Sequence, residues 1–335
     1  MRAALGGPFT GLENTVAMTF DSASTADDVL RGVDVRKKRY LITGVSSGMG
    51  IEVARALVAQ GAEVVGSARD VAKAEAATGE VRRAALAGAG RFEIIPLDLA
   101  QLRSVRAAAS HLLAGGQGFD AIIANAGVMA TPFGHTQDGF ETQFGTNYLG
   151  HFVLVNQLVP LLRPGGRVVT VSSNAHRWAD INLGDPNFEQ RPYDPWVSYG
   201  GSKTAVILFA VEFDRRHRDR GIRACSLMPG VAQTGLAQHL SEQQLATLGA
   251  RIASELGTAG ETFAFKTRAQ VAATSVWAAA VADGAQIGGR YAQDCQIAPI
   301  DNAPGIRFGA MAHALDPQRA KQLWHLSEGW VGERF

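Results

Sequence analysis

The chain has 335 residues, of which 46% are hydrophobic and 38 are glycines, enough to bury the core of one large domain or of two smaller ones. Its 32 basic and 31 acidic residues leave a formal net charge of +1, which argues against a nucleic-acid partner. No apolar run approaches the ~20 residues of a membrane span, and Cys225 and Cys295 lack the spacing of a metal site or a redox pair. We therefore expect a cytoplasmic protein with no membrane segment, no nucleic acid and no metal.

From residue 39 onward, short apolar runs alternate with longer segments of helical periodicity. Strands are predicted at 39–43, 63–68, 92–97, 119–124, 167–171, 223–227 and 289–292, and helices at 50–60, 71–87, 102–113, 138–162, 199–220 and 268–282. Most of the predicted strands lack polar alternation, which is typical of parallel strands covered on both faces. The alternation of strands with helices predicts a single doubly wound α/β domain, with a parallel sheet of about seven strands flanked by helices.

A glycine-rich turn joins the first predicted strand to the first predicted helix. Glycines let a backbone approach a pyrophosphate closely, and a helix N-terminus offers unpaired N–H groups and a favourable dipole. The spacing is GxxxGxG rather than the general GxGxxG, and a tight connection without a ligand is the alternative. The position between an apolar strand and a helix favours dinucleotide binding. The expected contacts are Gly44, Ser46, Ser47, Gly48, Met49 and Gly50.

The end of the second predicted strand bears on which nicotinamide dinucleotide binds. A carboxylate there bonds the ribose 2′-hydroxyl of NAD, whereas an arginine accommodates the 2′-phosphate of NADP. Ala68 supplies no acid, and Arg69 follows it directly. Asp70 is either that acid or the N-cap of the next helix. We predict NADP, with Arg69 at the phosphate, and keep NAD as the alternative.

Tyr199 and Lys203 lie four residues apart in a predicted helix, so they share one face of it. A nearby ammonium favours the phenolate, and we therefore expect Lys203 to lower the pKa of Tyr199 toward neutrality. A tyrosine of that kind can exchange a proton with an alcohol oxygen. The spacing alone is common, and a solvated helix face is the alternative.

Seven short motifs, in order along residues 40–295, resemble those of the classical short-chain dehydrogenases/reductases. They are the turn at 43–50, Asp98-Leu99, Asn125-Ala126-Gly127, Asn147, Ser172-Ser173, Tyr199 with Lys203, and Pro229-Gly230 with Thr234. The resemblance implies a Rossmann-type fold and a NAD(P)-dependent oxidoreductase that interconverts an alcohol and a carbonyl. We expect a lead-in at 1–37, the catalytic domain at 38–295, and a tail at 296–335 packed on the domain or on a neighbouring subunit.

Longer phrases at 24–34, 144–152 and 171–176 are similar to the retinol-dehydrogenase-like and WW-domain-oxidoreductase-like branch. That branch mostly favours NADP and handles hydrophobic alcohols, aldehydes or ketones, so the resemblance implies a hydrophobic alcohol or carbonyl substrate. It also implies a homodimer or homotetramer. Two alternatives are an NAD-preferring catabolic alcohol dehydrogenase and an NADP-sensing regulatory scaffold. A scaffold is disfavoured because such proteins often lose the catalytic tyrosine or lysine, and this chain keeps both.

The resemblance also implies roles for individual residues. Tyr199 is the general acid/base, Ser173 donates to the substrate oxygen, and Lys203 bonds the nicotinamide ribose. Asn147 supports a water relay from the lysine. Further cofactor contacts are implied where the third, fourth and sixth predicted strands end, at Asp98, Leu99, Asn125, Ala126, Gly127, Ala232 and Thr234.

Two segments are candidates for enclosing the substrate. Tyr199 comes 26 residues after Ser173, about twice the spacing of many members of the family. The extra segment, 178–196, is either a substrate wall or a surface excursion pinned by its aromatic residues. The segment 235–266 is expected to be a lid over the substrate.

Overall fold

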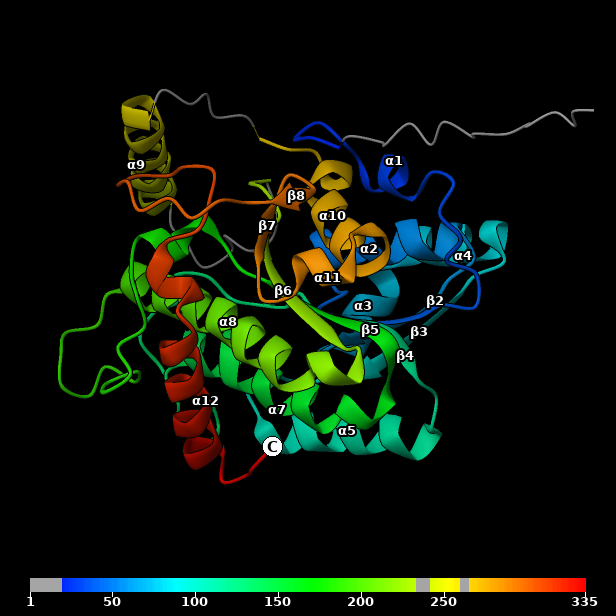
Figure 1. Cartoon of the computed structure of the whole chain (residues 1–335), viewed down its shortest axis with the longest axis horizontal. Helices are drawn as coiled ribbons and strands as arrows, with labels where there is room; N and C mark the ends of the chain where they lie inside the picture. The colour runs from blue at the N-terminus through cyan, green and yellow to red at the C-terminus, as the bar shows by residue number, and fades with distance from the viewer. Residues whose placement is uncertain (1–19, 233–241, 260–264) are drawn as a thin grey trace, which may run out of the picture.

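The computed structural model describes residues 20–232, 242–259 and 265–335 of the chain. In these ranges eight strands form one sheet, in the order β3-β2-β1-β4-β5-β6-β7-β8 (Figure 1). Neighbouring strands are parallel except β7 and β8, which are antiparallel. The strands are β1 (Arg39–Thr43), β2 (Glu63–Ala68), β3 (Arg91–Pro96), β4 (Phe119–Ala124), β5 (Leu162–Val171), β6 (Arg223–Met228), β7 (Tyr291–Gln293) and β8 (Gln296–Ile297). The predicted doubly wound α/β fold is confirmed, with β8 as an added strand.

The sheet grows in two directions from its middle. The chain winds from β1 through β2 to β3 on one side, then returns to β4 and continues outward through β5, β6 and β7. β1 and β4 are therefore neighbours, with Tyr40 opposite Ala121. In sheets of this kind ligands bind at the carboxyl ends of the strands, at the point where the winding reverses.

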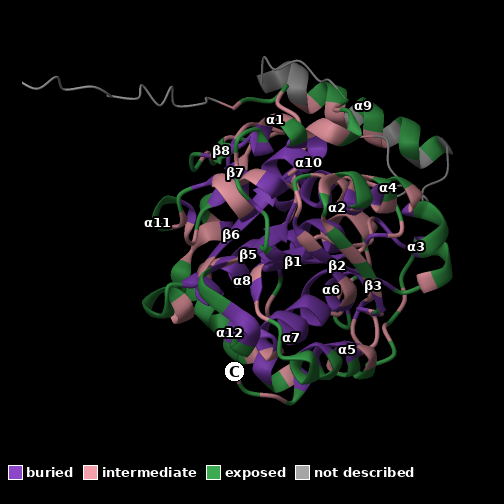
Figure 2. Ribbon diagram, turned by 90° about the vertical axis from the view of Figure 1, so that its right-hand side faces the viewer, coloured by how far each residue is buried: buried purple, intermediate pink, exposed green. Residues whose placement is uncertain are grey.

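The central strands are buried on both faces, and Figure 2 draws β1, β5 and β6 mostly in the colour of buried residues. Every residue of β1 is buried, including Arg39, which is 5% exposed. Its guanidinium lies 4.5 Å from the centroid of the Phe119 ring and donates to Glu63 at 2.6 Å, so the charge is both paired and stacked. Burial on both faces explains why these strands read as continuous apolar runs.

Two layers of helices cover the sheet. One layer contains α1 (Ala26–Leu30), α2 (Met49–Ala59), α4 (Gly79–Gly88) and α10 (Arg268–Val276), with α2 at its centre. The hydrophobic core beneath this layer continues across the adjacent face of the sheet. The opposite layer contains α5 (Leu102–Gly115), α7 (Gly150–Gln157) and α8 (Pro195–His217). Part of the expected lead-in is thus built into the domain, because α1 packs against α2 and α10.

Several helix predictions differ from the structure at their ends or in their continuity. The segment 71–87 is two helices, α3 (Val71–Ala77) and α4, because the Thr78 hydroxyl bonds the Ala74 carbonyl oxygen and interrupts the ladder. The segment 138–162 becomes helical only at Thr142, since Glu141 is the N-cap. It then contains α6 (Thr142–Phe144), a π-helical turn η1 (Gly145–Leu149), α7 and a short 3-10 turn η2 (Val159–Leu161).

The helix that carries Tyr199 begins four residues earlier than predicted. Asp194 is its N-cap and accepts the N–H groups of Trp196 and Val197 at 2.8 and 2.9 Å, with Pro195 in the first turn. An aspartate followed by a proline is a start signal that the apolar periodicity did not reveal.

The end of the chain forms α12 (Pro317–Val331), which packs across α8 (Figure 1). Its Trp324 is 1% exposed. The indole lies in a cluster of rings, with centroid distances of 5.1 Å to Phe152 and 5.8 Å to Phe209, and the Arg216 guanidinium covers it at 4.2 Å. This contact fixes the tail to the layer that holds the catalytic candidates.

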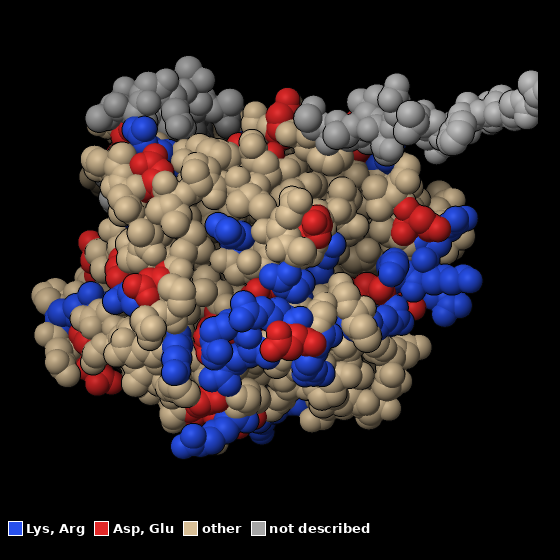
Figure 3. All heavy atoms as spheres, viewed as in Figure 1, with Lys and Arg blue, Asp and Glu red and all other residues tan. Residues whose placement is uncertain are grey.

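Lys and Arg side chains gather over the middle of the face drawn in Figure 3. Around the C-terminal end of α8, three arginines pair with buried acids. Arg215 and Arg216 both bond Glu212, whose side chain is 1% exposed, and Arg223 bonds Asp214 at 2.8 Å. These basic residues therefore serve in part to neutralise carboxylates of the fold.

Candidate active site

The predicted site residues that the structure describes gather at the carboxyl edge of the sheet. The glycine-rich turn follows β1, Arg69 follows β2, Asp98 follows β3 and Asn125 follows β4, while Ser173 follows β5. Because parallel strands end at the same edge, residues far apart in the sequence are brought to one side of the molecule.

The turn after β1 lets its backbone approach another group closely. Gly44 and Gly48 have φ values of +77° and +67°, in the region that favours glycine. A Cβ on Gly50 would lie 2.2 Å from the Gly44 carbonyl oxygen, so this position excludes a side chain. No side chain caps the N-terminus of α2 at Gly48. An uncapped helix N-terminus behind such a turn suits a pyrophosphate.

The loop after β4 is tied to the end of β1. Thr43 Oγ1 accepts the N–H groups of Asn125 at 2.9 Å and Ala126 at 3.0 Å. In return, Asn125 Nδ2 donates to the carbonyl oxygens of Thr43 at 2.8 Å and Gly44 at 3.2 Å. The predicted cofactor segments after β1 and β4 are thus one connected unit, and contact with a cofactor remains a prediction.

Ser173, and not Ser172, faces the tyrosine. The Ser172 hydroxyl is buried and donates to the Lys203 carbonyl oxygen at 2.9 Å. The Ser173 hydroxyl accepts the Ala175 N–H at 3.1 Å and lies beside Tyr199, where it favours a lower pKa of the phenol. The two serines point to different sides, as expected where an extended strand ends.

Two glycines in α8 let the chain after Ser173 pass against the helix backbone. This chain forms a 3-10 turn, η3 (Asn174–Arg177). A Cβ on Gly200 would lie 2.6 Å from the Ala175 carbonyl oxygen, and one on Gly201 would lie 3.4 Å from the Asp180 carbonyl oxygen. The close approach at Gly200 brings Ser173 beside Tyr199.

Lys203 lies beside Tyr199, as the spacing predicts, with Nζ 5.7 Å from the centroid of the tyrosine ring. Both side chains are buried, and burial lowers the pKa of Lys203 to about 8. Burial raises the pKa of Tyr199 to about 12, although its hydrogen bond with Ser173 acts in the opposite direction. The expected net lowering of the tyrosine pKa is therefore wrong for this structure. The cause is desolvation of the phenol, while Lys203 Nζ donates to the Val171 carbonyl oxygen at 2.9 Å.

Asn147 lies in the π-helical turn η1 and is 1% exposed. Its side chain accepts the Val128 N–H at 2.8 Å and donates to the Val128 carbonyl oxygen at 3.0 Å and to Ser202 Oγ at 3.0 Å. A Cβ on Gly127 would lie 3.0 Å from Asn147 Oδ1 and 3.5 Å from Lys203 Nζ. Asn147 is therefore a close neighbour of the lysine, and its relay role remains a prediction.

The residues after β2 and β3 are less clearly directed at a ligand. Arg69 is exposed, and Asp70 is the N-cap of α3, where it accepts the Lys73 N–H at 2.9 Å. Of the two alternatives for Asp70, a ribose-binding acid or a helix N-cap, the structure shows the N-cap. Asp98 accepts the Ala100 N–H at 3.0 Å, and Leu99 is 6% exposed within the core. The cofactor roles of Arg69, Asp98 and Leu99 remain predictions.

The segment after β6 is described only in part. Ala232 is half-buried, whereas Thr234 lies outside the described residues. The described portion of the expected lid is mainly α9 (Glu242–Ala259). Glu255 of this helix accepts the indole N–H of Trp178 at 3.0 Å. This bond connects α9 to Trp178, the residue that directly follows η3 and lies four residues after Asn174.

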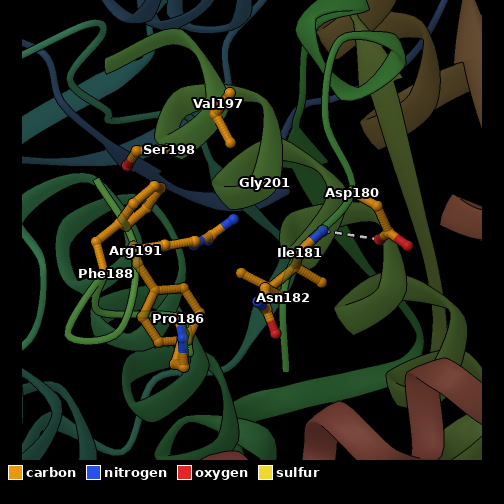
Figure 4. A pocket seen from close by; sticks show the side chains of 10 residues that line it. Asp180, Ile181, Asn182, Pro186, Phe188, Arg191, Val197, Ser198 and Gly201 are labelled. Atoms are coloured by element: carbon orange, nitrogen blue, oxygen red, sulfur yellow. Dashed lines mark hydrogen bonds between the residues drawn. The ribbon is translucent and has the colours of Figure 1, made fainter. Parts of the chain in front are cut away.

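The insertion at 178–196 has two parts. Its middle packs around a small hollow against α8, lined among others by Phe188 and Arg191 and by Ser198 and Gly201 of the helix (Figure 4). The guanidinium of Arg191 stacks 3.9 Å from the Phe188 ring centroid. Its two ends carry Trp178 and Trp196, whose rings meet edge to face at 5.7 Å. The middle packs against α8, the two tryptophan ends lie nearest in sequence to Ser173 and Tyr199, and the role of the segment as a substrate wall remains a prediction.

Two residues just after Ser173 bind the tail, a function that the sequence did not reveal. His176 Nδ1 donates to the Ser173 carbonyl oxygen at 2.7 Å, and Nε2 accepts the Met311 N–H at 3.1 Å. Arg177 donates to four carbonyl oxygens of the tail, those of Asp301, Ala303, Gly305 and Gly309. Their position three and four residues after Ser173 is the only signal in the sequence.

His151 is a second buried histidine that the sequence analysis left without a role. Nε2 lies 2.9 Å from Thr43 Oγ1, and Nδ1 lies 2.9 Å from the Asn147 carbonyl oxygen. Its four-residue spacing from Asn147 repeats that of Tyr199 and Lys203, and this signal could have drawn attention to it.

The described ranges contain neither a metal centre nor a membrane-spanning helix. No group of three or more His, Cys, Asp or Glu side chains there is arranged to hold a metal ion. None of the helices in 20–232, 242–259 and 265–335 is long and apolar enough to cross a membrane.

Known proteins match this chain along most of its length. A family model described as short chain dehydrogenase matches residues 38–245. The short-chain dehydrogenase/reductase prx1 of Penicillium roqueforti is 37% identical over 318 residues, which cover 92% of this chain and 90% of the relative. Retinol dehydrogenase 14 of Homo sapiens is 36% identical over 308 residues, 88% of this chain and 86% of the relative.

A solved structure supports the same assignment. The angucycline C-6 ketoreductase LanV with bound NADP has a TM-score of 0.61 and 26% identity, over 78% of this chain and 95% of that one. The predicted resemblance to retinol-dehydrogenase-like members is confirmed. The Rossmann-type sheet, the ordered motifs and these matches lead to one conclusion: the chain is an oxidoreductase that belongs to the short-chain dehydrogenase family.

Proposed function

We propose that the chain is an NADP-dependent oxidoreductase that interconverts a hydrophobic carbonyl compound and the matching alcohol. The observation that carries the proposal is that the half-buried Ser173 lies beside the buried Tyr199 and Lys203, at the edge of the sheet that also carries the turn after β1. A retinol dehydrogenase and a ketoreductase among the matching proteins have names that describe this type of reaction.

The residues present fit a nicotinamide dinucleotide. Gly44 and Gly50 let the turn pack closely against Asn125 and Ala126, in front of the uncapped N-terminus of α2 at Gly48, and this arrangement suits a pyrophosphate. Arg69, exposed at the end of β2, is assigned to the 2′-phosphate of NADP. When bound, the cofactor supplies or accepts the hydride, and the protein supplies position and charge.

Tyr199 holds the proton that the substrate oxygen requires. Its pKa, which burial raises to about 12, keeps the phenol neutral through the physiological range. In the reductive direction Tyr199 Oη gives its proton to the carbonyl oxygen while that oxygen gains electrons, and the alcohol forms. The reverse transfer accompanies oxidation. Lys203, with a pKa of about 8, is mainly protonated at pH 7 and stabilises the phenolate left behind.

Ser173 is placed to donate a hydrogen bond to the same substrate oxygen. Ser173 is half-buried and lies beside Tyr199, so one oxygen atom of a substrate can approach both hydroxyls. A donor held at the site of developing charge lowers the barrier without reorganising during the reaction. His176 supports this placement because it bonds the Ser173 carbonyl oxygen at 2.7 Å.

The test is a panel of hydrophobic aldehydes, ketones and alcohols, assayed by nicotinamide absorbance with NADP(H) and NAD(H). On the best substrate, Tyr199→Phe should lower kcat by about 100-fold or more while NADPH binding, measured by fluorescence, is retained. Tyr40→Phe is the control, because it removes a buried hydroxyl near the amino end of β1. Unchanged turnover in Tyr199→Phe would overturn the mechanism, and a clear preference for NAD would overturn the choice of cofactor.

A further inference from the structure

His151 joins the end of β1 to the π-helical turn that carries Asn147. The side chain extends from the second residue of α7 and is 4% exposed. Its two ring nitrogens each lie 2.9 Å from an oxygen, Thr43 Oγ1 at one end and the Asn147 carbonyl at the other. A single ring thus spans two segments that both adjoin the predicted cofactor and relay positions.

The partners of Thr43 determine which ring nitrogen carries the proton. Thr43 Oγ1 accepts two N–H groups, from Asn125 and Ala126. A hydroxyl has two lone pairs and one proton, so with both lone pairs used Thr43 donates its proton to His151 Nε2. Nδ1 then carries the ring proton. The Asn147 carbonyl oxygen can only accept, which requires the same tautomer.

The ring is neutral and does not shuttle protons. Burial lowers the pKa of His151 to about 4, the bond to the Asn147 carbonyl raises it, and the charge of Lys203 on α8 lowers it further. Both nitrogens are engaged at neutral pH, one as donor and one as acceptor. The ring therefore acts through geometry.

The segments that His151 holds in place extend to the surroundings of Lys203. Its bond fixes the main chain of Asn147, whose side chain clamps both the N–H and the carbonyl of Val128. Gly127 precedes Val128, and a Cβ on this glycine would meet both Asn147 Oδ1 and Lys203 Nζ. A π turn lacks the regular spacing of an α-helix, so a side chain that ties down its carbonyl limits where the turn can move.

We propose that His151 is a positioning residue for the reaction: it holds Asn147 and the loop after β4 in place beside Lys203. The inference rests on the proposed function for its catalytic consequence. The tautomer and the bonds of His151 are properties of the cofactor-free protein, and they can be measured without any substrate.

Two substitutions separate the bonds of the ring. In His151→Asn, the amide nitrogen takes the place of Nδ1 and keeps the donor to the Asn147 carbonyl. In His151→Leu, a side chain of similar bulk donates nothing. The matched control is Asn156→Leu, because Asn156 Nδ2 makes the same kind of bond on α7, to the Phe152 carbonyl oxygen four residues back at 2.9 Å. That bond lies one turn farther from the site.

Long-range 1H–15N NMR of the cofactor-free protein should show the His151 ring neutral and protonated at Nδ1 at pH 7, with His151→Asn identifying its signals. Protonation at Nε2, or a charged ring, would overturn the inference whatever the enzyme's activity. In steady-state assays His151→Leu should lower kcat about ten- to hundredfold with little change in KM, and alter the pH profile, while His151→Asn recovers most of kcat.

The control tells positioning from general loss of stability. Asn156→Leu should lower the unfolding temperature and keep the wild-type kcat and pH profile. Equal losses of kcat in His151→Asn and His151→Leu, or in Asn156→Leu and His151→Leu, would overturn the proposal. Failure of the proposed function is distinct, because it would leave every variant and the wild type inactive on the substrate panel.

Discussion

Gly200→Ala places a methyl group in the contact between α8 and the turn that follows Ser173. The new Cβ would lie 2.6 Å from the Ala175 carbonyl oxygen and 3.1 Å from the main-chain nitrogen of Ala179. Both of these neighbours are backbone atoms, so neither can move aside as the end of a long side chain would. The carbonyl must retreat by about 0.8 Å to reach the 3.4 Å of ordinary contact, and it carries Ser173 with it.

The expected effect is larger on catalysis than on folding. Overpacking costs about 1–3 kcal/mol, and alanine recovers about 1 kcal/mol of helix propensity over glycine, so the net loss of stability is about 0–2 kcal/mol. A displacement approaching 1 Å between Ser173 and Tyr199 lowers kcat by up to about 100-fold. The assay compares kcat, KM and urea unfolding for the variant and the wild type.

Gly201→Ala is the matched control in the next position of the same helix. Its Cβ would lie 3.4 Å from the nearest atom, the Asp180 carbonyl oxygen, so the methyl fits without displacement. Helix propensity then predicts a gain in stability of up to about 1 kcal/mol and an unchanged kcat. The reasoning fails if Gly200→Ala keeps full activity, or if the two variants lose activity equally.

Two further predictions concern charge. Burial lowers the pKa of Lys203 to about 8 in the folded chain, so folding is disfavoured below that pH and gains as the pH rises through 8 toward the unfolded value. In urea unfolding, the stability of Lys203→Met relative to the wild type should therefore increase by about 2 kcal/mol from pH 10 to pH 7; a difference independent of pH would contradict burial of the charge. Arg69→Ala should raise the KM for NADP at least about tenfold and leave that for NAD nearly unchanged, because a bond between charged groups is lost only with the phosphate. Arg83→Ala, which removes an exposed arginine of α4, is the control, and equal losses with both cofactors would refute the assignment.

The sheet could be predicted from the sequence because its central strands are buried on both faces. β1, β2 and β4 match their predicted bounds, since burial on both faces demands continuous apolar runs of limited length. β8 has two residues, too few to produce a pattern. The break at Thr78 and the late start at Thr142 depend on single side-chain bonds to the backbone, which periodicity does not record.

The candidate site was predictable in its composition more than in its electrostatics. Ser173, Tyr199 and Lys203 were identified by motif and do lie together. The direction of the tyrosine pKa was wrong, because helical spacing reports proximity while desolvation depends on everything packed around the ring. His151 and His176 could not be assigned a role from the sequence for a related reason, since each acts by joining segments whose proximity exists only in the folded chain.

The packing of α12 on α8 has a consequence for self-association. Phe209 and Phe213 of α8, which contact Trp324, are 2% and 0% exposed. The chain thereby covers this side of α8 with its own helix α12, and these rings are not available to a second subunit. A homodimer or homotetramer must accordingly form through another surface, or its subunits must exchange their C-terminal helices.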